Sequence, residues 1–224
     1  MFPISDSIKA LRKPYINTFL IIFNIAIFFY QLSLGSEMRY FIFEYGLIPL
    51  KVFAPFEIVP AIEKIYPFFT SMFLHGGWFH LISNMYFLFI FGDNVEDDLG
   101  HVKYLFVYIM FGLAAAITQV IMFSNSGIPT IGASGAVAGV MGYYFIRYPH
   151  ATVKTLVIFI FFITIVDIPA IIFLGVWFFI QFISGSTQAA VASGGGIAWW
   201  AHIGGFFSGI LICIINRKRY YRAG

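Results

Sequence analysis

Four polar side chains lie in strongly apolar surroundings and have the types and spacing that acyl-transfer chemistry needs. Ser134 lies in the small-residue stretch IGASGAVAG, and His202 lies in AHIGG. A hydroxyl beside an imidazole base is the basic unit of nucleophilic catalysis. His80 and Asn84 are four residues apart, so on a helix they share one face. Together with the backbone amide of Ser134, they could stabilise an oxyanion.

Each of these residues also has a purely structural interpretation. A serine among glycines and alanines more often permits close helix packing, and a histidine or asparagine within a membrane often links two helices by a hydrogen bond. The serine motif also departs from the G-x-S-x-G elbow of soluble hydrolases, because Ala136 stands at the last glycine position. The positions of the four residues within the predicted spans are therefore needed to distinguish a catalytic role from a packing role.

The composition is that of a membrane protein with several spans. Of 224 residues, 60% are hydrophobic and 10% are charged, whereas about a quarter of the residues of a soluble domain are charged. The apolar run 16–34 is longer than the h-region of a signal peptide (about 7–15 residues), and no A-x-A cleavage site follows it, so it predicts the first span. The single cysteine, Cys213, excludes a disulfide within the chain.

We predict an all-α bundle of six transmembrane helices. Its spans are Tyr15–Leu34, Trp78–Phe91, Lys103–Phe123, Ser134–Tyr148, Ile168–Ile183 and Trp199–Asn216. With the N-terminus inside, ten Lys and Arg residues fall on the cytoplasmic side and three on the outer side, as the positive-inside rule requires. We therefore expect both termini in the cytoplasm. Residues 1–224 would form one membrane domain, with a short cytoplasmic segment at 1–14 and a basic tail at 217–224.

Two segments do not fit a simple span. Residues 35–77 are aromatic, broken by prolines and too charged to cross the bilayer, so we expect an amphipathic element on the outer surface. Residues 152–183 would make one helix of about 48 Å, too long for a hydrocarbon core of about 30 Å. We place 152–167 at the cytoplasmic interface, with Asp167 as the N-cap of the fifth span; one long tilted helix remains the alternative.

The four polar residues are predicted to lie at a similar depth. Counting back from cytoplasmic charges at about 1.5 Å per residue places Ser134 and His80 about 20 Å, and His202 about 22 Å, above the inner edge. Asn84 follows His80 one turn lower. Three different spans would thus bring these side chains together roughly 10 Å below the outer surface. The shared depth favours catalysis over packing for Ser134 and His202.

Glycines on two spans would allow the approach that this arrangement needs. Gly135 and Gly139 lie four residues apart on the fourth span, and Gly205 and Gly209 do so on the sixth. Such small-residue stripes let two helices pack closely. They would bring Ser134 within hydrogen-bond reach of His202. His75, near the outer surface, is expected to be interfacial.

At these residues the sequence resembles the rhomboid family of intramembrane serine proteases. The resemblance lies in GASG (Gly132–Gly135), HGGWFHLISN (His75–Asn84) and AHIGGFFSG (Ala201–Gly209), in the order of the family. It implies a six-helix core and a dyad without an acidic third member. Ser134 would be the nucleophile and His202 the general base, with His80, Asn84 and the Ser134 amide at the oxyanion. Gly132 matches the motif position before the serine, and Gly205 and Gly209 match close-packing positions.

Two positions depart from the family pattern. Many members carry Trp-Arg in the first outer loop, where this chain has Tyr66 and Pro67. Some members place an aromatic residue one turn after the nucleophile, where this chain has Ala138. Neither departure removes a catalytic group.

The resemblance implies a serine endopeptidase of a prokaryotic cell membrane that cleaves membrane-anchored proteins near the outer face. The expected partners are transmembrane protein substrates and the lipid bilayer, with no nucleic acid, cofactor or metal. The loop Ser184–Gly196 is small and glycine-rich, and it is predicted to be a mobile cap over the cavity. The first alternative is a catalytically dead adaptor of the same fold. The second is a channel or transporter, which would need a polar pore or broken inverted repeats.

Overall fold

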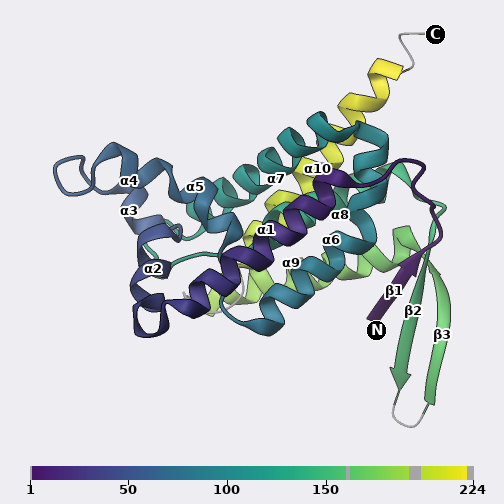
Figure 1. The fold of residues 1–224 in the computed structure, drawn as a ribbon, viewed down its shortest axis with the longest axis horizontal. Helices are drawn as coiled ribbons and strands as arrows, with labels where there is room; N and C mark the ends of the chain where they lie inside the picture. Colours follow the sequence, from purple (N-terminus) through teal and green to yellow (C-terminus); the bar gives the residue numbers. More distant parts are fainter. Residues whose placement is uncertain (1, 160–161, 192–197, 221–224) are drawn as a thin grey trace.

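The protein is mostly helical, and the computed structural model describes residues 2–159, 162–191 and 198–220 (Figure 1). Six long helices form the body: α1 (Tyr15–Ser33), α6 (Trp78–Leu99), α7 (His101–Met122), α8 (Ser134–Arg147), α9 (Ala170–Val191) and α10 (Trp199–Tyr220). Short helical pieces follow α1: η1 (Gly35–Glu37), α2 (Met38–Tyr45), α3 (Pro49–Phe53), α4 (Ala61–Ile65), α5 (Pro67–Thr70) and η2 (Ser71–Phe73). They lie at the end of the bundle away from the sheet (Figure 1).

Helix α8 is the centre of the bundle. Every residue from Gly135 to Tyr144 is buried, and α8 packs against α6, α7, α9 and α10. A Cβ atom on Gly205 would collide with the carbonyl oxygen of Gly135, and one on Gly209 would collide with the carbonyl oxygen of Gly139. The backbones of α8 and α10 therefore touch directly, which only glycine allows here. This contact sets the position of everything that α8 and α10 carry.

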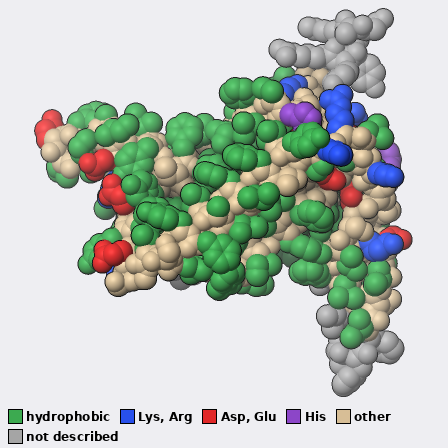
Figure 2. All heavy atoms as spheres, viewed as in Figure 1, with side chains coloured by type: hydrophobic (Ala, Val, Ile, Leu, Met, Phe, Trp, Pro, Cys, Tyr) green, Lys and Arg blue, Asp and Glu red, His purple; other side chains and the backbone are tan. Residues whose placement is uncertain are grey.

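Four of the described helices are long and apolar enough to cross a membrane. They are Tyr15–Ser33, His101–Met122, Ala170–Thr187 and Trp199–Asn216. Helix α6 ends in the acidic run DNVEDD, and α8 has 14 residues, so length and composition alone do not qualify these two. Figure 2 shows hydrophobic side chains over the middle of one face, between charged side chains gathered at the two ends. This distribution is typical of a bundle embedded in a bilayer.

The prediction of an all-α fold is wrong, because the chain also forms a three-stranded sheet. The strands β1 (Phe2–Asp6), β2 (Thr152–Phe159) and β3 (Phe162–Pro169) pair in the order β1-β2-β3, and both pairs are antiparallel. Phe2 lies opposite Leu156, and Thr152 lies opposite Pro169. The β2–β3 hairpin projects from the bundle across the direction of the helices (Figure 1). Its β-branched and aromatic residues explain the preference for strand over helix.

The sheet corrects the prediction for residues 152–183. Asp167 lies within β3 opposite Lys154, so it is not an N-cap, and the long single helix is also wrong. Helix α9 begins at Ala170 and continues to Val191. Most of the predicted loop Ser184–Gly196 is therefore helical, and residues 192–197 lie outside the described part of the chain. Helix α6 likewise continues past Phe91 to Leu99.

Acidic residues at the end of α6 fix the N-terminal segment to the bundle. The buried carboxylate of Glu96 accepts hydrogen bonds from the backbone N–H groups of Ile16 (2.9 Å) and Asn17 (2.7 Å). Asp97 accepts from the N–H groups of Leu11 (3.0 Å) and Arg12 (3.1 Å). Glu96 thus satisfies donors that the first turn of α1 leaves without helical partners.

Candidate active site

A cavity of about 830 Å³ is bordered by α6, α8, α9, α10 and the segment before α8. The polar side chains on its wall include all four residues singled out from the sequence. The cavity-lining residues whose side chains bear on the chemistry are His80, Asn84, Ser134, Trp177, Gln181 and His202. Around these groups the wall is largely apolar and aromatic. The cavity is large enough for a segment of peptide, since ligand pockets typically measure about 300–1,000 Å³.

Ser134 is the first residue of α8, and the chain is held in place just before it. Gly132 donates its N–H to the carbonyl of Ser71 (2.9 Å). Its φ is +125°, a backbone conformation that residues other than glycine rarely adopt. The first helical hydrogen bond runs from Val137 N–H to the carbonyl of Ala133 (3.0 Å). The N–H groups of Ser134, Gly135 and Ala136 precede that bond. Ser134 therefore sits at a helix N-terminus, which favours negative charge.

His202 is buried in the first turn of α10 and is contacted by three side chains. Its Nδ1 lies 2.6 Å from Oε1 of Gln181. Its ring lies 5.9 Å from that of Trp177 and 6.1 Å from that of Trp199, measured between ring centroids. An amide oxygen can only accept, so Nδ1 carries the proton in this pair. In the neutral ring, Nε2 then holds the free lone pair that a general base needs.

The sequence predicted hydrogen-bond reach between Ser134 and His202, and no hydrogen bond joins these two described side chains. Both groups line the one cavity. The ends of their helices are also neighbours, because a Cβ on Gly135 would lie 3.7 Å from the carbonyl oxygen of Ala201. Catalytic hydrogen bonds are often long in ligand-free proteins and shorten when substrate binds. The side chains of Ser134 and His202 thus line the same cavity without a hydrogen bond between them.

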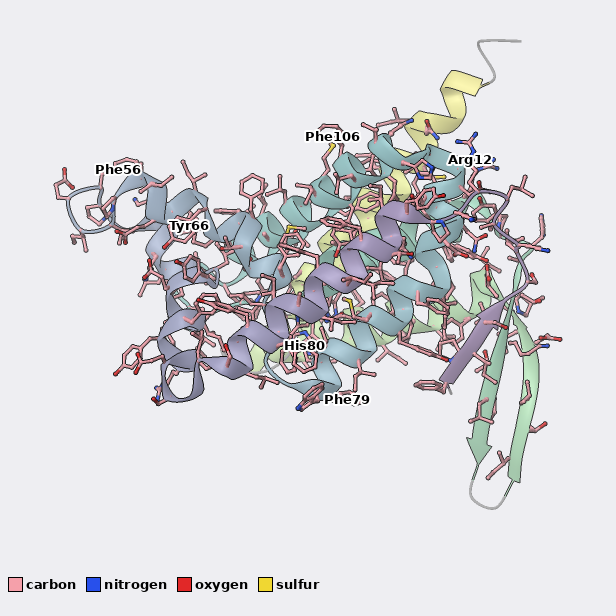
Figure 3. All side chains as sticks on the ribbon, in the orientation of Figure 1. Arg12, Phe56, Tyr66, Phe79, His80 and Phe106 are labelled. Carbon is pink, nitrogen blue, oxygen red and sulfur yellow. The ribbon has the colours of Figure 1, made fainter. Side chains whose placement is uncertain are left out.

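His80 and Asn84 lie one turn apart on α6. His80 is half-buried and lines the cavity, while its neighbour Phe79 is exposed and points away from the bundle (Figure 3). Nδ1 of His80 accepts the N–H of Gly76 at 3.3 Å, so the neutral ring carries its proton on Nε2. A Cβ on Gly132 would lie 2.6 Å from this Nε2 and 3.6 Å from Ser134 Oγ. The glycine thus leaves open the space that an oxyanion would need.

Asn84 contributes a second donor to this space. Its side-chain nitrogen is buried and has no hydrogen-bond partner among the described residues. A buried amide without a partner is costly, and such exceptions are found where a ligand or water completes the site. His80 and Asn84 therefore present N–H donors to the cavity, whereas His202 presents a lone pair.

The remaining predicted glycines lie where α8 meets its neighbours. A Cβ on Gly135 would lie 2.5 Å from the Cβ of Ala115 on α7, and one on Gly139 would collide with the ring of Phe111. The Cα atoms of these two glycines therefore face α7, while their carbonyls face Gly205 and Gly209 of α10. In the described part of the chain no cluster of His, Cys, Asp or Glu has the arrangement of a metal site.

Two residues of the site were not found from the sequence, and His75, which is not among the residues that line the cavity, does not lie where the sequence predicted. The sequence prediction includes Trp177 and Gln181 only as members of the apolar span Ile168–Ile183. A glutamine inside such a span is itself a signal of a polar site. His75 was expected at the interface, but it is fully buried, and its ring centroid lies 5.2 Å from that of His80. The backbone of His75 is held by Gln31 through two hydrogen bonds of 3.0 and 3.2 Å.

The sequence also matches known proteins. A model of the Rhomboid domain matches residues 63–219. Rhomboid protease GlpG of Haemophilus influenzae is 35% identical over 92 residues, 39% of this chain and 46% of that protein. Rhomboid protease AarA of Providencia stuartii is 30% identical over 139 residues, 54% of this chain and 46% of that protein.

An inactive protein is among the relatives. Inactive rhomboid protein 1 of Drosophila melanogaster is 32% identical over 87 residues, 39% of this chain and 6% of that protein. The match to each of these three relatives spans less than half of the relative's own length. These similarities identify a common domain, and the chemistry must be argued from the site.

Proposed function

The chain belongs to the rhomboid family, and from that premise we propose that it is a serine endopeptidase that cleaves membrane-anchored proteins near the outer face of the membrane. One observation carries the proposal: the side chains of Ser134, His202, His80 and Asn84 line one cavity. The hydrogen bonds at Nδ1 of the two histidines favour a lone pair at Nε2 of His202 and a proton at Nε2 of His80. A base, a nucleophile and oxyanion donors are the parts that acyl transfer requires. No cofactor, metal or nucleic acid takes part.

The first half of the reaction forms an acyl-enzyme. Oγ of Ser134 attacks the carbonyl carbon of the scissile peptide bond, and the hydroxyl proton passes to Nε2 of His202. The carbonyl electron pair moves onto oxygen, where N–H groups of His80, Asn84 and the Ser134 backbone stabilise it. When the C=O bond re-forms, the C–N bond breaks, and the leaving amine takes the proton from His202. The new N-terminus departs, and the acyl group remains on Ser134.

The second half returns the enzyme to its starting state. Water gives a proton to Nε2 of His202, and its oxygen bonds to the acyl carbon. The same donors hold the second oxyanion. The bond to Oγ then breaks, Ser134 regains its proton from His202, and a carboxylic acid is released. Protons balance without any further group.

We assign the membrane topology on the same basis. The six helices α1, α6, α7, α8, α9 and α10 cross the membrane as one domain over 1–224, and both termini lie in the cytoplasm of a prokaryotic cell. Helix α8 crosses with the help of the helices around it, since it is enclosed by protein rather than lipid. Ten basic residues on the cytoplasmic side against three outside support this orientation. Reporter fusions that reveal a terminus at the outer face would contradict it.

Cleavage of a single-span reporter protein in reconstituted vesicles tests the function. Ser134→Ala and His202→Ala should each abolish cleavage, and the double variant should be no worse, because the two residues act as a unit. Ser208→Ala is the matched control: its hydroxyl bonds to the carbonyl of Gly205 in its own helix at 2.6 Å. Chelators should have no effect. If Ser134→Ala cleaves as well as wild type, cleavage does not proceed through Ser134 and the proposed mechanism fails. If wild type does not cleave the reporter at all, the catalytically dead adaptor becomes the better account.

A further inference from the structure

Helix α9 contacts the catalytic histidine through two side chains one turn apart. Trp177 places its ring 5.9 Å from that of His202 at an interplanar angle of 33°, and Gln181 places Oε1 2.6 Å from Nδ1. Residues four apart lie on the same helix face. Both side chains therefore reach His202 only when this face of α9 is turned towards α10.

Gln181 is a buried polar residue on the packed face of α9. Phe173 and Leu174 are buried on that face, whereas Phe179, Ile180 and Val176 are exposed on the other side. A glutamine buried in such surroundings is costly unless its amide is hydrogen-bonded. The bond to His202 meets that need, and it joins the two polar groups at the point where α9 and α10 meet.

The hydrogen bond also selects the tautomer of His202. A neutral imidazole with its proton on Nε2 could not remove the proton of Ser134 through that nitrogen. Because Oε1 of Gln181 only accepts, it stabilises the ring with the proton on Nδ1 and the lone pair on Nε2. The same bond stops rotation of the ring about its Cβ–Cγ bond.

We infer that Gln181 is a positioning residue, which holds His202 in the tautomer and orientation of a general base and ties them to the packed position of α9. The inference rests on the proposed function. It follows that an outward movement of α9, such as one that admits a substrate helix, releases His202. His202 regains this tautomer and orientation only when α9 packs against α10 again.

Two substitutions of Gln181 separate positioning from packing. Gln181→Leu keeps similar bulk but removes the acceptor. It should lower kcat on the order of 10- to 100-fold, with KM and melting temperature little changed. Gln181→Glu restores an acceptor and should recover much of the rate. Its carboxylate favours the protonated imidazole, so the acid limb of the kcat/KM profile should move to higher pH.

The control comes from the same helix. Thr187→Val removes an exposed hydroxyl that bonds to the carbonyl of Ser184 at 2.9 Å, and it should leave kcat and the pH profile unchanged. The readouts are kcat, KM, the pH profile and the melting temperature in one detergent.

Two outcomes would overturn the inference. One is a Gln181→Leu protein with the kcat and acid limb of wild type. The other is a Gln181→Glu protein whose acid limb does not move, a result that holds even if the leucine variant fails to fold. Neither outcome touches the proposed function, which fails if wild type does not cleave or if its cleavage does not depend on Ser134.

Discussion

The two histidines that line the cavity differ in the hydrogen bonds at their Nδ1 atoms, and this difference sets which ring nitrogen carries the proton. His202 donates from Nδ1 to a side-chain carbonyl, and His80 accepts at Nδ1 from a backbone N–H. The first ring therefore presents a lone pair at Nε2, and the second presents a proton there. In the proposed mechanism, one histidine would thus serve as base and the other as oxyanion donor, because their neighbours differ.

Removal of an oxyanion donor should lower the rate of chemistry without weakening the fold. Asn84→Ala and His80→Ala should each lower kcat, with KM and melting temperature little changed. One such donor is typically worth about 10²–10³ in rate, and the other donors of the site soften a single loss. Both variants should therefore keep partial activity, unlike Ser134→Ala.

A buried asparagine outside the cavity gives the control for this measurement. The side-chain nitrogen of Asn24 on α1 donates to the carbonyl of Leu20 at 2.7 Å. Asn24→Ala should lower the melting temperature and leave kcat unchanged. If Asn84→Ala behaves like Asn24→Ala, then Asn84 contributes to stability alone and does not bind the oxyanion.

Much of the site could be predicted at the residue scale, because depth along a span follows directly from sequence position. Ser134, His202, His80 and Asn84 could each be placed by counting from a charged anchor. Gln181 could not be placed in this way. Its contact with His202 depends on how α9 is rotated about its axis and on where α9 begins, and the sheet before α9 sets both.

At the scale of elements, the contact between α8 and α10 is the most tightly constrained in the bundle. Carbonyl oxygens of α8 lie against the Cα atoms of Gly205 and Gly209, so the two helices are already at the closest approach that their backbones allow. Ser134 and His202 lie at the ends of these two helices. Their separation is therefore a property of the helix pair and not of local loops.

Gly205→Ala should destabilise the protein strongly, because its Cβ would collide with the backbone of Gly135. Overpacking of this kind typically costs about 1–3 kcal/mol, and a rigid backbone gives little relief. Gly175→Ala is the matched control, since its Cβ would lie 3.8 Å from the nearest atom, in the ring of Phe145. It should be neutral or stabilising. Melting temperatures in one detergent check the pair, and equal values for the two variants would contradict this account of the helix contact.

The sheet is the element that the sequence predicted least well. Strand β1 pairs with β2, whose residues lie 147 to 154 positions further along the sequence (Asp6 opposite Val153, Phe2 opposite Leu156), and no local pattern near residue 2 or residue 152 specifies that partner. The β-branched residues of 152–167 indicated an interfacial segment but not its pairing. Such long-range pairing is decided when the bundle brings the two segments together.

We expect the β2–β3 hairpin to lie against the cytoplasmic leaflet. Ile163, Ile165 and Val166 are exposed on β3, and the hairpin extends sideways from the bundle (Figure 1). An environment-sensitive label on Ile165→Cys, with the single native Cys213 replaced, should emit as in an apolar medium and be quenched by nitroxide lipids. The same label on Lys9→Cys should emit as in water. A water-like spectrum at position 165 would exclude contact with lipid.

At the scale of the whole molecule, burial perturbs the carboxylates of Asp6 and Asp93, which lie at the end of the bundle where the sheet joins it. Burial raises the pKa of Asp93 to about 6 from an ordinary 3.8, helped by the nearby charges of Asp6 and Asp97. Burial also raises the pKa of Asp6, although the hydroxyl of Tyr144 opposes this shift. A raised carboxyl pKa means that the folded state binds a proton more readily than the unfolded state. Stability from these groups is therefore lost as pH rises through the interval from about 4 to 6.

Asp93→Asn should remove the larger part of this dependence. The amide oxygen can still accept the N–H of Asn94, a bond of 2.7 Å in the wild type. The melting temperature of the variant should exceed that of wild type at pH 7 and come close to it at pH 3, below the ordinary pKa of 3.8, because Asp93 is then largely protonated in both states. Thermal melts in one uncharged detergent across this range check the prediction. A difference that is equal at both pH values would show that the charge of Asp93 has no part in it.

The proposed mechanism depends on Ser134 being the nucleophile and on His202 being the base that activates it. Reaction with a fluorophosphonate, followed by mass spectrometry of the labelled peptides, measures this directly. We predict a single adduct on Ser134 in wild-type protein, no adduct in Ser134→Ala and much slower labelling in His202→Ala. Labelling that persists in Ser134→Ala, or an adduct on another serine in protein that cleaves substrate, would contradict the assignment.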